Sequence, residues 1–231
     1  GYELLVLRKS EKADMLMDFA SLSLKKGESW HSSSKDERAF LLAEGSAEII
    51  VGKKVDWIGP GIEGFAKNDS VTIDLLPGGE TKIRASRTSL LDENPTVLHL
   101  PKETKVVIKA LSERALFYVS STDNNMDFSP RLYLPYECRV EYRNEGTMQG
   151  TATRIVRTVF DKQTAPWSNL VLGEEEERQT HDTIKLHEGS YHDKAGCRNI
   201  FLYAIERCDD DAEERTIVVR IEKLRRILGI Q

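Results

Sequence analysis

The chain has few histidines and cysteines, no long apolar run and no basic stripe. A transmembrane helix needs about 20 consecutive apolar residues, and no stretch of these 231 residues comes near that length. The first residues show no signal-peptide pattern. The net charge is −5, with both signs spread along the chain, so no basic patch is available to neutralise phosphates. We therefore expect neither a membrane nor a nucleic acid as a partner.

The three cysteines, Cys138, Cys197 and Cys208, are odd in number and widely spaced, and they form no CxxC pair. This pattern is typical of free thiols in a reducing compartment, so we expect a cytoplasmic protein. Motifs of other enzyme classes are missing too. There is no G-x-S-x-G elbow, no Walker loop and no GxGxxG followed by a helix.

The composition, 39% hydrophobic and 31% charged, is that of a globular protein that buries a core. Short apolar runs separated by Gly, Pro and Asn or Asp turns, with no helical segment between them, indicate an antiparallel sandwich or barrel. Seven such runs lie within the first 120 residues: Asp18 to Leu24, Arg38 to Leu42, Ala47 to Val51, Val71 to Leu76, Val97 to Leu100, Lys105 to Ala110 and Ala115 to Val119.

The second half of the chain repeats the β-like pattern over Thr151 to Phe160, Asn169 to Leu172 and Asn199 to Ile205. Asp123-Asn124-Asn125 followed by Ser129-Pro130 is typical of a linker. We therefore divide the chain into a domain at 1–122, a linker at 123–150 and a second domain at 151–231.

Only the end of the chain has helical periodicity. Apolar residues recur at spacings of four, three and four, with Arg and Lys between them, at Ile217, Ile221, Leu224 and Leu228. This predicts a short C-terminal helix that packs on its own domain; a partner-binding helix is the alternative.

The segments from His31 to Glu37 and from Pro101 to Val106 resemble the metal-binding frame of a cupin barrel with its ligands largely replaced. That frame is His-x-His-xxx-Glu followed by a Pro-x-Gly-x-x-His turn. Alternate residues of a strand face the same way, so His-x-His places both imidazoles inside the barrel. Here His31 takes the first position, Ser33 the second and Glu37 the third, before Gly45 closes a hairpin. In the turn, Pro101 and Glu103 are followed by Val106 where the frame has histidine. Two of four ligands are replaced, so we interpret this barrel as structural and His31 as an exposed histidine.

The second half keeps the closing turn instead. His187-Glu188-Gly189-Ser190-Tyr191-His192 has the glycine and the last histidine in place. His192 is therefore a candidate metal ligand, the alternative being an ordinary half-buried residue. No His-x-His with a following Glu precedes it, His181 stands alone, and Glu174 to Glu177 form a charge run that predicts a solvated loop.

Several stretches resemble the 5-deoxyglucuronate isomerase family, the IolB/KduI-type bicupins. The most specific is Gly146–Asp161, which continues as Ala165–Glu174. Arg87–Pro95 with Leu98–Pro101, and the turn Thr183–His192, resemble the family more weakly. The resemblance covers about residues 2 to 206 and implies an all-β chain of two tandem cupin barrels of the jelly-roll type.

The resemblance also implies a metal-dependent aldose–ketose isomerase of inositol or uronate catabolism, acting on a sugar acid such as 5-deoxyglucuronate. A divalent metal, zinc or manganese, would lie in the C-terminal barrel with His192 and, as a weaker candidate, His181. Arg154 or Arg157 could hold the substrate carboxylate. Because strand alternation puts them on opposite faces, at most one points inward, and surface arginines are the alternative. A homo-oligomer is an open alternative to a monomer.

The sequence departs from the family between Glu174 and Thr183, where the family has a His-rich segment with the other three ligands. Only Glu175 to Asp182 fills that interval here. Eight strands need roughly 80 residues with their loops, so the second barrel is short of a strand pair. Either the sequence as given leaves out a segment near 174–182, or the protein has a true deletion there. The shortage of ligands in both halves keeps a second interpretation open, a non-catalytic cupin that binds a sugar or acts as a scaffold.

Overall fold

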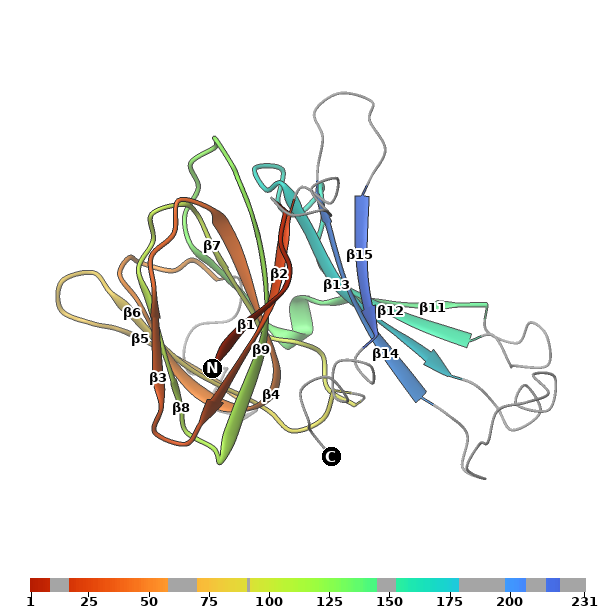
Figure 1. The fold of residues 1–231 in the computed structure, drawn as a ribbon, viewed down its shortest axis with the longest axis horizontal. Helices are drawn as coiled ribbons and strands as arrows, with labels where there is room; N and C mark the ends of the chain where they lie inside the picture. Colours follow the sequence, from red (N-terminus) through yellow and green to blue (C-terminus); the bar gives the residue numbers. More distant parts are fainter. Residues whose placement is uncertain are drawn as a thin grey trace.

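The computed structural model describes residues 1–8, 17–57, 70–90, 92–144, 153–178, 198–206 and 215–220. These residues form an all-β cupin-type fold of two antiparallel sheets and a single 3₁₀ turn, η3 (Pro135–Glu137). Figure 1 shows the first sheet curled into a barrel, with the second sheet beside it. No helix in these ranges is both long and apolar enough to cross a membrane.

The ten strands of the first sheet fold into two layers. One layer contains β1 (Tyr2–Val6), β2 (Asp18–Lys25), β9 (Arg114–Thr122), the first part of β4 (Glu37–Val51), β7 (Val97–Leu100) and β10 (Arg131–Tyr133). The other contains β3 (Ser29–Ser32), β8 (Val106–Ala110), the second part of β4, β6 (Thr81–Arg87) and β5 (Val71–Leu75).

Strand β4 connects the two layers, because its first six residues pair with β7 and β9 and its last five with β6 and β8. The two runs expected as separate strands of a hairpin are therefore one strand. It bends at Gly45, which has a φ of +88° and whose Cβ, if present, would lie 2.0 Å from the carbonyl oxygen of Arg114. Only glycine allows this approach.

The second sheet is a meander in chain order: β11 (Arg139–Arg143), β12 (Thr153–Phe160), β13 (Leu170–Arg178), β14 (Arg198–Glu206) and β15 (Arg215–Arg220). Its β12 and β13 pack on the outer face of the barrel. Along β4, Phe40 and Leu42 face the barrel core, whereas Ala39 and Leu41 face the second sheet, where they join Phe160. Residues 39–43 of β4 are covered on both faces, and they are continuously apolar rather than alternating.

Three expectations about elements are corrected. The segment 123–150, expected as a linker, carries β10, η3 and β11, because Leu132 to Leu134 are buried. The expected C-terminal helix begins in β15, where Thr216 to Val219 are β-branched and pair with β14; Ile221, Leu224 and Leu228 lie outside the described residues. The charge run Glu174 to Glu177 is part of β13 rather than a solvated loop.

Candidate functional site

The ligand positions of the first barrel do not converge in the structure. On β3, Trp30 packs against the barrel core and His31, the next residue, is exposed. On β4, Glu37 shares its face with Ala39 and Leu41 and points toward the second sheet. The frame's first and third positions thus lie outside the barrel. Among the residues that the structure describes, no group of three or more His, Cys, Asp or Glu side chains could hold a metal ion.

The closing turn of this frame retains its backbone geometry. Glu103, at the position where the frame has glycine, has a φ of +59°, in the left-handed region that glycine favours. Val106, at the histidine position, is 1% exposed and belongs to the barrel core. The turn therefore has the backbone geometry of the frame, but a core residue, Val106, stands at the position of the metal ligand.

The carboxylate of Glu37 is instead the centre of a buried polar cluster between the two sheets. His99 Nε2 lies 2.6 Å from Glu37 Oε1, and Asn124 Nδ2 and the amide of Asn169 donate to Oε2 over 2.7 and 3.0 Å. Ser168 Oγ donates to Oε1. Burial alone would raise the pKa of Glu37, but the hydrogen bonds from His99, Ser168 and Asn169 outweigh it and lower the pKa.

Aromatic rings seal this cluster from water. The imidazole of His99 stacks on Phe160, with centroids 4.6 Å apart and an interplanar angle of 10°, and touches Phe128 on another side at 4.6 Å. Both His99 and Glu37 are fully buried. An ionised carboxylate only accepts, so His99 Nε2 donates. This cluster connects β4 and β7 of the barrel to the segment before β13, so its role is structural.

Two further buried ion pairs lie in the same interface. Arg87 on β6 binds Glu174 on β13 in a bidentate pair at 2.7 and 2.8 Å, and both side chains are at most 1% exposed. Arg157 Nη2 on β12 donates to Glu176 over 2.8 Å. Glu174 and Glu176 follow Leu170 and Leu172 at a spacing of two, and this alternation is the sequence signal that they share the buried face.

The two candidate arginines lie on opposite faces of β12, as the alternation predicts. Arg157 is 5% exposed and faces the barrel, where its guanidinium is paired with Glu176. Arg154 lies on the face away from the barrel, with its side chain 47% exposed and 3.1 Å from Glu175. Arg143 of β11 is directly opposite Arg154 in the ladder and therefore shares that face.

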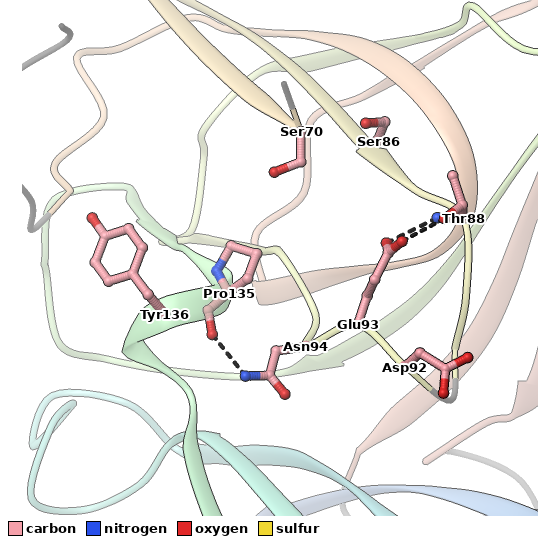
Figure 2. Close-up of a pocket in the computed structure, with 8 residues that line it drawn as sticks. All are labelled: Ser70, Ser86, Thr88, Asp92, Glu93, Asn94, Pro135 and Tyr136. Carbon is pink, nitrogen blue, oxygen red and sulfur yellow. Dashed lines mark hydrogen bonds between the residues drawn. The ribbon is translucent and has the colours of Figure 1, made fainter. Parts of the chain in front are cut away.

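The described residues line at least two cavities. One, of about 600 Å³, lies between η3 and the ends of β5 and β6 and is lined mostly by hydroxyl, carboxylate and amide groups (Figure 2). Another, of about 420 Å³, is lined by the aromatic residues Phe128 and Trp167 and by the charged residues Asp56, Asp127 and Arg131. The predicted metal ligands His192 and His181 lie outside the described residues. Strand β13 continues through Glu174 to Arg178, and residues 179–197 beyond it are likewise not described.

An all-β chain with a cupin-type barrel and a second sheet docked on it has the architecture of a bicupin. The model of the KduI/IolB family matches residues 3–182. The chain therefore belongs to the KduI/IolB family, which is a family of isomerases. No curated protein sequence matches the chain.

Of three similar solved structures, the first agrees with this chain in fold. A crystal structure of an IolB-like protein from Salmonella typhimurium LT2 is 17% identical, with a TM-score of 0.54 over 94% of this chain and 77% of that one. A cupin 2 conserved barrel domain protein from Leptotrichia buccalis is 13% identical, with a TM-score of 0.40 over 78% and 59% of the two chains. A mutant of Bacillus subtilis oxalate decarboxylase is 12% identical, with a TM-score of 0.43 over 76% and 53%.

Proposed function

We propose that this protein is an aldose–ketose isomerase that acts on a sugar acid such as 5-deoxyglucuronate, in the catabolism of inositol or uronates. The observation that carries the proposal is the match of the KduI/IolB family over residues 3–182. The reaction moves a proton between adjacent carbons, with no net oxidation. We place it in the cytoplasm, which agrees with the free thiol of Cys138.

We assign recognition of the substrate carboxylate to Arg154. Its exposed guanidinium lies on the face of the second sheet away from the barrel, and Arg143 stands opposite it. Each guanidinium already pairs with a glutamate, Arg154 with Glu175 at 3.1 Å and Arg143 with Glu141 at 2.9 Å, so a substrate carboxylate would bind through their remaining N–H groups. Arg157 is a weaker candidate, because its guanidinium is buried against Glu176.

Replacing Arg154 with Ala should raise KM for the sugar acid at least about tenfold, because a hydrogen bond to a charged group contributes ~1.5–3 kcal/mol. Arg84→Ala is the matched control, since Arg84 is an exposed arginine on β6 that pairs with a glutamate, Glu48, at 2.9 Å. Steady-state kinetics of both variants test the assignment, which is wrong if the two variants have the same KM.

The resemblance implies a divalent metal, zinc or manganese. We propose His192 as a ligand of this metal and His181 as a weaker candidate. The part of the chain that the structure describes does not fit such a metal, since His31 is exposed and Glu37 is bound to His99. We therefore derive no step through a metal.

Turnover by the full-length protein tests the proposal. The protein is incubated with 5-deoxyglucuronate, with added zinc or manganese in one sample and a strong chelator in another. We expect the aldehyde to be converted to a ketone and the chelator to abolish the conversion. If no conversion occurs with either metal, the isomerase proposal fails; if turnover resists the chelator, only the metal dependence fails.

A non-catalytic cupin that binds a sugar or acts as a scaffold is the second candidate. It is favoured by one observation, that the described residues offer no set of three metal ligands. This candidate predicts that His192→Ala leaves sugar binding and stability unchanged, whereas the isomerase predicts a large loss of turnover. Measuring both properties on that one variant separates the two functions.

A further inference from the structure

The 600 Å³ cavity beside η3 has a lining suited to a polyhydroxylated ligand. Its volume lies within the 300–1,000 Å³ of small-molecule sites. Figure 2 shows Pro135 and Tyr136 on one side and Ser70, Ser86 and Thr88 on the other. Hydroxyl groups both donate and accept, so they can match the hydroxyls of a sugar in either sense.

The walls of the cavity are held in place before any ligand binds. Glu93 accepts hydrogen bonds from the amide of Thr88, over 3.0 Å, and from its hydroxyl, and Asn94 Nδ2 donates to the carbonyl of Pro135 over 3.0 Å. Arg87, anchored on Glu174, donates to the carbonyl of Glu93 over 2.7 Å. Because these bonds fix the loop, a ligand does not have to order it on binding.

The charge of the lining discriminates between ligands. Asp92 and Glu93 contribute two carboxylates, and the lining residues within the described ranges include no Lys, Arg or His. A sugar acid would meet repulsion here, so this cavity is unsuited to the substrate proposed above. The ring of Tyr136, which is 52% exposed, offers an apolar face to the C–H groups of a sugar.

We infer that this cavity is a binding site for a neutral sugar or cyclitol, separate from the site of isomerisation. The carboxylates have acceptor positions beyond the bonds from Thr88 and Ser89, and these pair with ligand hydroxyls together with the side-chain oxygen of Asn94. Tyr136 packs against the ring. The inference does not depend on turnover, because it rests on a cavity of the first barrel and η3.

The test compares two ligands with the same ring, methyl glucoside and methyl glucuronoside, by calorimetry or ligand-observed NMR at low salt. The glucoside should bind, and the glucuronoside should bind at least roughly fivefold more weakly, since one charge pair at 4 Å contributes about 1 kcal/mol in water. Tyr136→Ala and Ser86→Ala should each weaken glucoside binding severalfold. Tyr142→Ala, which removes a tyrosine that is 59% exposed on β11, should not.

The absence of saturable glucoside binding would overturn the inference, as would equal binding by wild type and Tyr136→Ala. Displacement of the glucoside by spermidine at lower concentration would overturn it in favour of a cation site. Turnover of the sugar acid is measured on the same samples. Wild-type protein that binds the glucoside but does not isomerise contradicts the proposed function only, whereas protein that isomerises without binding contradicts this inference only.

Discussion

Buried charged side chains accompany the apolar contact between the two sheets. Glu37, Glu174 and Glu176 are all fully buried, and each lies within hydrogen-bond distance of a histidine or an arginine. Burying an ion is costly, and the cost is offset by the opposite charge and the hydrogen bonds that the ion meets. These residues therefore specify how the second sheet docks, since any other docking would leave a charge unpaired.

The bidentate pair of Arg87 and Glu174 gives the most direct test of this role. Glu174→Leu should destabilise the protein by about 3–5 kcal/mol, because it leaves the guanidinium buried and unpaired. The double variant Arg87→Met, Glu174→Leu should recover much of that loss. Denaturant unfolding of the single and double variants measures both, and a double variant no more stable than Glu174→Leu would contradict the account.

The pKa of Glu37 predicts a dependence of stability on pH. Because the pKa is lower in the folded than in the unfolded state, the ionised carboxylate stabilises the protein above its unfolded pKa of about 4.3. That stabilisation is lost as the pH falls through the folded-state pKa. The difference in unfolding free energy between wild type and Glu37→Gln should therefore shrink below about pH 4.3. A difference that is constant from pH 7 to pH 3 would show that Glu37 is not the titrating group.

Strand alternation predicted some of these residues and could not predict others. The opposite faces of Arg154 and Arg157 follow from a period of two and are confirmed. The burial of Glu174 was missed, because four adjacent glutamates indicate solvent, and the alternation with Leu170 and Leu172 is a weak signal until the arginine that meets them is known. That arginine, Arg87, lies 87 residues away in the chain.

At the scale of elements, β4 depends on a single glycine. Gly45→Ala combines a positive φ with a Cβ that would lie 2.0 Å from a backbone oxygen, so the strand or β9 must shift. We expect a loss of several kcal/mol, against about 1 kcal/mol for Gly78→Ala, which has a φ of +100° but open space around it. Thermal unfolding of the two variants measures the difference, and equal losses would mean that the contact with Arg114 is unimportant.

The elements themselves were predicted unevenly. The expected runs of the first barrel all fall in strands, because turn residues bound them closely. Strands β1, β3 and β6 were missed. Trp30 in β3 is flanked by polar residues, and Lys82, Arg84 and Ser86 interrupt β6. The prediction of a C-terminal helix was wrong over Arg215–Arg220. It gave more weight to four apolar residues at helical spacing than to the β-branched run Thr216 to Val219.

At the scale of the whole molecule, the first barrel has a structural role. Its core is closed by aliphatic and aromatic side chains such as Leu22, Phe40 and Ile83, while its outer face supports the second sheet. In the function proposed above, the first barrel supports the second sheet and the second half of the chain carries the reaction. The fold class was predictable from the spacing of strands and turns. The packing of the second sheet on the barrel was not, because it depends on the contacts of Glu37 and Arg87.

The most direct test is proton NMR of 5-deoxyglucuronate with the full-length, metal-supplemented protein. The proposed isomerase predicts that the aldehyde signal falls while a ketone product rises in equal amount, without consumption of oxygen. An aldehyde signal that stays constant over hours, at protein concentrations where the fold is intact, would contradict it.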